Sequence, residues 1–133
     1  MSAEFKGRGN LGTHPVIRHV TLDGAFRAVL NLRVYFDRPR RRLDGTYEDH
    51  GGFWMTVSVW DERAEQAARL LRKGARVYVE GALRLHAWEE SGEARSELRL
   101  ESDYLALDMG RLQQVGFRER DDSSNDLDDG QAA

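Results

Sequence analysis

Residues 53–88 read FWMTVSVWDERAEQAARLLRKGARVYVEGALRLHAW, and this stretch decides the fold. Its beginning, 53–60, alternates as a half-buried strand does, with an apolar face of Phe53, Met55, Val57 and Val59. Residues 61–73 then repeat alanine and leucine at helical spacing. We expect Asp61 to cap this helix and Gly74 to end it after Lys73. From 76 to 88 the alternation returns, so the stretch predicts strand, helix, strand.

A long strand precedes this stretch. Residues 26–36 place alternate apolar side chains on one face, namely Phe26, Ala28, Leu30, Leu32, Val34 and Phe36. Weaker strands are expected near 5–11, 16–20 and 95–107, with loops at 38–52 and 89–94. Many strands with one inserted helix suggest a small barrel. We predict an all-β fold, a five-stranded Greek-key OB-fold barrel with one helix between the third and fourth strands.

Length and composition exclude several classes of protein. The chain has 133 residues, which favours a single domain, and it has no cysteine for disulfides or thiolate zinc sites. No apolar run approaches the roughly 18 residues of a membrane span. Residues 1–6 also lack the apolar core of a signal peptide. The sequence therefore predicts a soluble protein of the cytoplasm.

The net charge of −3 conceals an uneven distribution. Residues 1–42 hold nine basic and three acidic side chains, whereas 43–117 hold nine basic and fourteen acidic ones. The segment 118–133 holds two basic and six acidic side chains and has little apolar surface to bury. This pattern predicts a basic working surface on a domain over 1–112, followed by a disordered acidic tail over 113–133.

A glycine motif near the N-terminus is not a cofactor site. Gly7, Gly9 and Gly12 match the dinucleotide-binding pattern G-x-G-x-x-G. That pattern works only where a strand leads into a helix, and here residues 15–17, Pro-Val-Ile, favour extended chain. We expect the glycines to permit a bulge or a sharp bend at a barrel corner instead.

Catalytic and metal sites are not expected either. The four histidines, His14, His19, His50 and His86, show no zinc-ligand spacing. An enzymatic alternative would be a hydrolase that uses the acidic cluster Glu89, Glu90 and Glu93. These side chains flank an expected hairpin tip, where solvation is the simpler interpretation. We therefore predict no enzyme, no cofactor and no metal.

The polar faces of three strands combine aromatic and basic side chains. Each aromatic residue, taken singly, also fits a subunit interface. Together they suit single-stranded nucleic acid, because bases stack on flat rings while cations follow the phosphates. The strand residues are Asn31, Arg33, Tyr35, Trp54, Thr56, Ser58, Trp60, Arg84, His86 and Trp88; the following loop adds Arg38, Arg40, Arg41 and Arg42.

Four segments in order resemble the bacterial single-stranded DNA-binding protein (SSB) family. They are residues 9–18 (GNLGTHPVIR), 28–34 (AVLNLRV), 53–68 (FWMTVSVWDERAEQAA) and 71–84 (LRKGARVYVEGALR). The resemblance implies an OB-fold homotetramer that coats and protects single-stranded DNA in replication, recombination and repair. It also implies base stacking by Trp54, Trp60 and Trp88 and DNA contact by Arg84, with Asn31 and Arg33 on the family's second strand.

The chain departs from the family pattern in two places. Many members carry a further Trp after the second strand, where this chain has the arginine-rich 38–42. Members also end in an acidic tip closing on Pro-Phe that docks replication and repair proteins. The tail here is acidic but closes on Gly-Gln-Ala-Ala at 130–133, without that Pro-Phe. An alternative to the tetramer is a dimeric OB-fold primosomal accessory or adaptor protein. The residues also do not distinguish DNA from RNA as the ligand.

Overall fold

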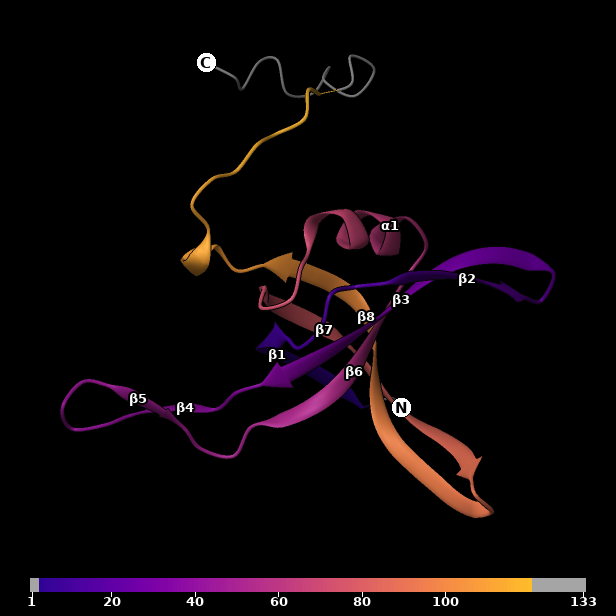
Figure 1. Cartoon of the computed structure of the whole chain (residues 1–133), viewed down its shortest axis with the longest axis horizontal. Coiled ribbons are helices and arrows are strands. Elements are labelled where there is room, and N and C mark those ends of the chain that lie inside the picture. The colour runs from indigo at the N-terminus through magenta and orange to yellow at the C-terminus, as the bar shows by residue number, and fades with distance from the viewer. Residues whose placement is uncertain (1–2, 121–133) are drawn as a thin grey trace.

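The computed structural model describes residues 3–120 (Figure 1). The acidic residues expected to form a disordered tail lie for the most part outside these described residues. The strands are β1 (Glu4–Leu11), β2 (Ile17–Leu22), β3 (Ala25–Phe36), β4 (Pro39–Arg41), β5 (Tyr47–Asp49), β6 (Phe53–Trp60), β7 (Arg76–Glu90) and β8 (Glu93–Leu107). The helix α1 is Asp61–Leu70, and a 3-10 turn, η1, is Met109–Arg111.

Five of the strands form a closed ring. β1 pairs with β7, β7 with β8, β8 with β6, β6 with β3, and β3 returns to β1. β1 reaches β3 only through Asn10 and Leu11, so β2 occupies the other half of the same β3 edge. The helix lies between β6 and β7, the third and fourth strands of the ring in chain order. The expected five-stranded OB-fold barrel with its inserted helix is confirmed.

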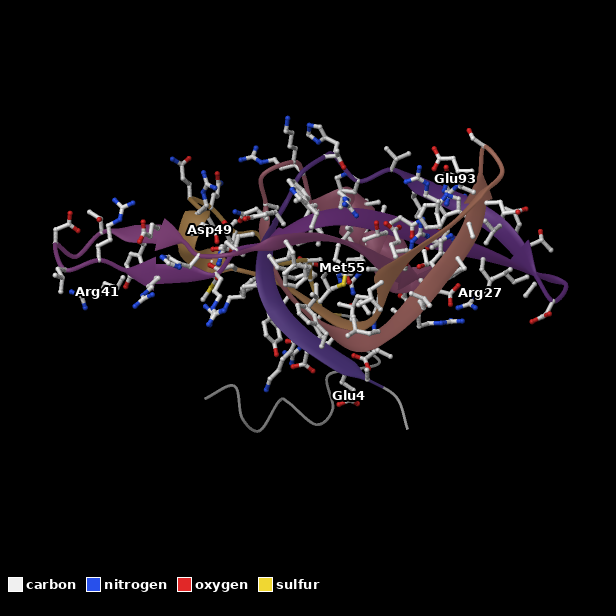
Figure 2. All side chains as sticks on the ribbon, turned by 90° about the horizontal axis from the view of Figure 1, so that it is seen from below. Glu4, Arg27, Arg41, Asp49, Met55 and Glu93 are labelled. Atoms are coloured by element: carbon white, nitrogen blue, oxygen red, sulfur yellow. The ribbon has the colours of Figure 1, made fainter. Side chains whose placement is uncertain are left out.

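Alternate residues of the ring strands fill the barrel. Because successive strand side chains point to opposite faces, one face of each strand is buried inside. Leu30, Leu32, Val34, Val57, Val59, Val77, Val79 and Leu100 are each at most 1% exposed. Met55 lies with them in the middle of the molecule (Figure 2). The period-2 pattern of the sequence therefore identified most of the core, although Phe53, on the predicted apolar face, is 46% exposed.

The helix α1 covers one end of the barrel. Its small residues Ala64 and Ala67 are buried, which lets the helix approach the strands closely. The helix ends at Leu70, three residues before the predicted Lys73, because Leu71 turns into extended backbone and buries its side chain in the core. Gly74 does adopt a left-handed φ of 88°, but in the turn that follows, where its N–H donates to the Leu11 carbonyl.

The predicted cap of α1 is also wrong. The residue at the N-cap position is Trp60, and no side chain caps the helix. The Asp61 carboxylate instead forms two hydrogen bonds with the guanidinium of Arg27, at 3.1 and 2.7 Å. The Asp61 carboxylate therefore binds an arginine on β3 and does not cap the helix, contrary to the prediction from the local sequence.

Three hairpins project beyond the barrel (Figure 1): β2–β3, β4–β5 and β7–β8. The β4–β5 hairpin occupies residues that the sequence predicted as loop. Among residues 3–120 no second layer covers the apolar side chains of the projecting parts, which explains why Phe26 is 74% and Leu85 68% exposed. The alternation of apolar and polar residues continues beyond the barrel, but the apolar side chains there are not buried.

The glycine motif lies where β1 leaves β7 and turns toward β3. A Cβ at Gly9 would lie 2.4 Å from the carbonyl oxygen of Tyr35, and one at Gly12 would lie 2.6 Å from the Trp54 ring. The glycines therefore allow close approach at a barrel corner, as expected. Of the two expected features, a bulge or a bend, the bulge is absent among the paired residues of β1, because the irregularity in strand pairing lies between Glu80 and Gly81 on β7.

Candidate nucleic-acid interface

A band of basic side chains crosses four strands on the outside of the barrel. Arg33 on β3 lies opposite Thr56 on β6, Thr56 opposite Arg99 on β8, and Arg99 opposite Arg84 on β7. Arg33 Nη1 donates to Thr56 Oγ1 at 3.2 Å. Three strand-to-strand steps span about 14 Å. The band therefore offers cations along a line that a phosphate backbone could follow.

An open aromatic ring lies beside one end of this basic band. Trp54 is 49% exposed. The Tyr35 ring lies 5.2 Å from its ring centroid, and the Arg33 guanidinium lies 5.9 Å from it. An exposed indole next to a cation can stack a base while the cation meets the neighbouring phosphate.

Trp60 is less exposed than Trp54, and its indole N–H is held by a hydrogen bond. Its indole Nε1 donates to Glu101 Oε2 at 2.9 Å, and the guanidinium of Arg27 lies 4.6 Å above its ring. Arg27 is itself fixed by Asp61, and this hydrogen-bonded pair lowers the pKa of Asp61 and raises that of Arg27. One face of the Trp60 ring is thus already occupied by a cation.

The third tryptophan lies on the projecting β7–β8 hairpin. The rings of His86 and Trp88 stack with centroids 5.5 Å apart. Ion pairs with Arg95 hold Glu90 and Glu93 at the hairpin tip, at 3.8 and 3.5 Å. The tip lies at the end of the molecule away from β4–β5, as the label of Glu93 shows (Figure 2). Trp88 is therefore remote from Trp54.

The arginine-rich segment forms strand β4 of the β4–β5 hairpin (Figure 2, label Arg41). Asp49 anchors this hairpin, because its carboxylate accepts from the Tyr35 hydroxyl and from the backbone N–H of Arg38. The hydrogen bond raises the pKa of Tyr35 and lowers that of Asp49. The four arginines are exposed, and Arg42 pairs with Glu48 at 2.8 Å.

The sequence is similar to known single-strand binding proteins. The model of the single-strand binding protein family matches residues 8–109. The chain belongs to this family. A single-stranded DNA-binding protein of Corynebacterium glutamicum is 39% identical over 98 residues, which cover 71% of this chain but only 42% of that relative.

Two solved structures share the fold of this single-strand binding family member. The small single-stranded DNA-binding protein of Streptomyces coelicolor matches with a TM-score of 0.65 at 22% identity, over 84% of this chain and 98% of that one. A deletion mutant of the single-stranded DNA binding protein from Thermus aquaticus matches with a TM-score of 0.61 at 26% identity, over 81% and 51%. These matches support the barrel assignment.

The structure divides the predicted DNA-binding residues into separate groups. Asn31, Arg33, Tyr35, Trp54, Thr56 and Ser58 lie opposite one another on β3 and β6, and Arg84 joins them through β8. His86 and Trp88 lie further out on β7, and the loop arginines lie on the β4–β5 hairpin. Ser58 is 6% exposed and donates to Asn31 Oδ1 at 2.7 Å. Its side chain therefore positions Asn31 and is itself hardly accessible to a ligand.

Sequence reasoning missed several side chains of this surface. Arg99 and Glu101 belong to β8, which the sequence showed only as a weak strand. Arg27, on β3, is not among the predicted DNA-binding residues, although it lies over the Trp60 ring. The alternation of 97–101 around the buried Leu100 is the signal that could have found Arg99 and Glu101, because it puts both on the outer face.

Other candidate sites remain separate from this surface. The imidazoles of His14, His19 and His50 contact the Lys73 N–H, the Phe26 ring and the Glu48 carboxylate, respectively. Within residues 3–120 the structure assembles no group of three or more His, Asp or Glu side chains that could hold a metal ion. The described part of the chain also contains no helix with the length and apolarity to cross a membrane.

The anchor of the basic hairpin is expected to depend on pH. The pKa of Asp49 in the folded chain lies below its ordinary value of 3.8. The anchor therefore contributes fully above that value and is lost as the pH falls through the folded pKa. We expect the Arg38 amide to lose protection from hydrogen exchange, relative to its intrinsic rate, as the pH falls below about 3.8.

The control for this anchor is Asp49→Asn, which cannot ionise. Its Oδ1 can still accept from the Arg38 N–H, so the Arg38 amide should keep part of its protection at neutral pH and should show no acid step. An acid step of the same size in the variant and in the wild-type chain would contradict the anchor.

Proposed function

We propose that this single-strand binding family member coats and protects single-stranded DNA in replication, recombination and repair, without requiring a defined sequence motif. The observation that carries the proposal is the basic band of Arg33, Arg99 and Arg84 next to the open ring of Trp54. The resemblance of the relatives, whose names describe single-stranded DNA-binding proteins, supports it. The role is binding, and we propose no catalytic step.

The geometry explains a preference for single strands over duplexes. Phosphates of the bound strand pair with the arginines of the basic band, and an unpaired base stacks on Trp54. A base in a duplex is already stacked and paired, so it cannot offer its face to the indole without unpairing. A strand held in this way cannot re-anneal along the contacted nucleotides, which is the basis of protection.

The assembled protein is part of the same proposal. We propose a homotetramer in the cytoplasm, as membership of the family suggests, whereas the adaptor alternative predicts a dimer. Light scattering in solution measures the mass and separates the two. Replication and repair proteins are proposed partners, and the acidic residues that would dock them lie largely outside the described residues.

Titration with a labelled oligo(dT) tests the proposal. We expect binding and quenching of tryptophan fluorescence at low salt, with weaker binding to duplex DNA of the same length. The logarithm of the affinity should fall with the logarithm of salt concentration at about 0.7 per neutralised phosphate. RNA of the same length, run in parallel, measures the preference for deoxyribose. Absence of quenching and of binding at low salt would contradict the function.

A further inference from the structure

A groove of about 320 Å³ lies between β2 and the β7–β8 hairpin on the outer face of the barrel. Its floor holds the polar side chains of Asn31, Ser58 and Glu101 next to the ring of Trp60. Arginines at positions 18, 84 and 99 line it as well, and Leu22 and Leu85 add an apolar wall. A groove with apolar walls, a few convergent polar groups and cations can hold a base together with its phosphate.

The hydrogen bonds of the floor leave one acceptor and one donor available. Trp60 Nε1 donates to Glu101 Oε2, so this carboxylate is held in place at 2.9 Å. Its other oxygen, Oε1, forms an ion pair with Arg84 Nη1 at 3.7 Å, which is longer than a hydrogen bond and leaves Oε1 able to accept one. Ser58 Oγ donates to Asn31 Oδ1 at 2.7 Å, and no described residue accepts a hydrogen bond from Asn31 Nδ2.

We propose that this groove is a base-edge subsite that favours cytosine over thymine, with Glu101 as the specificity-determining residue. The inference rests on the proposed function and adds a bias at one nucleotide position to binding that otherwise tolerates any sequence.

The chemistry of the two bases explains the bias. A carboxylate only accepts hydrogen bonds, and the exocyclic amino group of cytosine donates them. The ring nitrogen next to that amino group is an acceptor and suits the Asn31 amide. Thymine instead presents a carbonyl oxygen at the position of the amino group. The carboxylate repels this oxygen, so the oxygen is left without a hydrogen-bond partner. The difference in affinity between the two bases arises at the floor of the groove. Stacking and phosphate contacts are the same for both bases, so they do not cancel it.

The test compares Glu101→Gln with a matched control, Glu97→Gln. Glutamine at 101 can still accept from Trp60 through its carbonyl oxygen, while its amino group now faces the groove and suits the thymine carbonyl. Glu97 lies four residues away on the same outer face of β8, pairs with Arg99 at 3.0 Å and is as exposed as Glu101, at 33% against 32%. Both variants remove one negative charge, so both should strengthen binding of any DNA through electrostatics.

The readout is the ratio of affinities for oligo(dC) and oligo(dT) of equal length, measured by anisotropy of a terminal label at one salt concentration. We expect Glu101→Gln to shift this ratio toward oligo(dT) by about fivefold or more, and Glu97→Gln to leave it unchanged. Equal ratios in the wild-type chain and in Glu101→Gln, or equal shifts in both variants, would overturn the base-edge subsite. Failure of the wild-type chain to bind either oligonucleotide would overturn the proposed function, and the subsite with it.

Discussion

Trp54→Ala is expected to weaken binding of single-stranded DNA by roughly five- to a hundredfold, because stacking of a base on an aromatic ring contributes about 1–3 kcal/mol. Trp54 is the tryptophan with the open ring, half-exposed and next to the Arg33 guanidinium. Its removal also takes away the ring against which Tyr35 packs. Fluorescence anisotropy with a labelled oligo(dT) measures the loss without relying on tryptophan emission.

Trp60→Ala and Trp54→Phe are the informative comparisons. We expect a smaller loss for Trp60→Ala, because one face of that ring already holds Arg27 and its Nε1 is bonded to Glu101. Trp54→Phe keeps a flat ring and should retain part of the affinity. If the Trp60 variant lost far more affinity than the Trp54 variant, the open ring would not be the principal stacking platform.

Leu30→Ala should lower the free energy of unfolding by about 2–5 kcal/mol, since it removes buried methyl groups and leaves a cavity. Leu30 is fully buried on β3, between its paired neighbours Ile17 on β2 and Val59 on β6. Urea denaturation followed by tryptophan fluorescence measures the change. All variants are compared at the same protein concentration, because assembly would add to the apparent stability.

Leu43→Ala is the matched control for this cavity. It removes the same atoms from a residue that is 109% exposed at the tip of the β4–β5 hairpin. We expect its free energy of unfolding to stay within about 0.5 kcal/mol of the wild-type value. Similar losses in both variants would show that the barrel interior at Leu30 is not the source of stability.

Much of the fold follows from local pattern. The alternation of 28–36 and 55–59 placed the inward residues of these parts of β3 and β6 correctly, because side chains on a strand alternate whatever the tertiary context. The helix and its start at Asp61 followed from the spacing, but it ends at Leu70 and not at the predicted Lys73. The pattern failed at Phe26 and Leu85, since alternation states which side chains share a face but not whether anything covers that face.

The sequence by itself determined the barrel, its core and the presence of aromatic and basic side chains on the outer face. It treated Trp54, Trp60 and Trp88 alike, because a residue's face is local information. Only the tertiary structure decided that Trp54 is open, that Arg27 and Glu101 hold Trp60, and that Trp88 lies apart on a hairpin. The physical reason is that pairing of β8 with β6 and β7 brings Arg99 and Glu101 to residues more than 10 positions away, and no local pattern records those contacts.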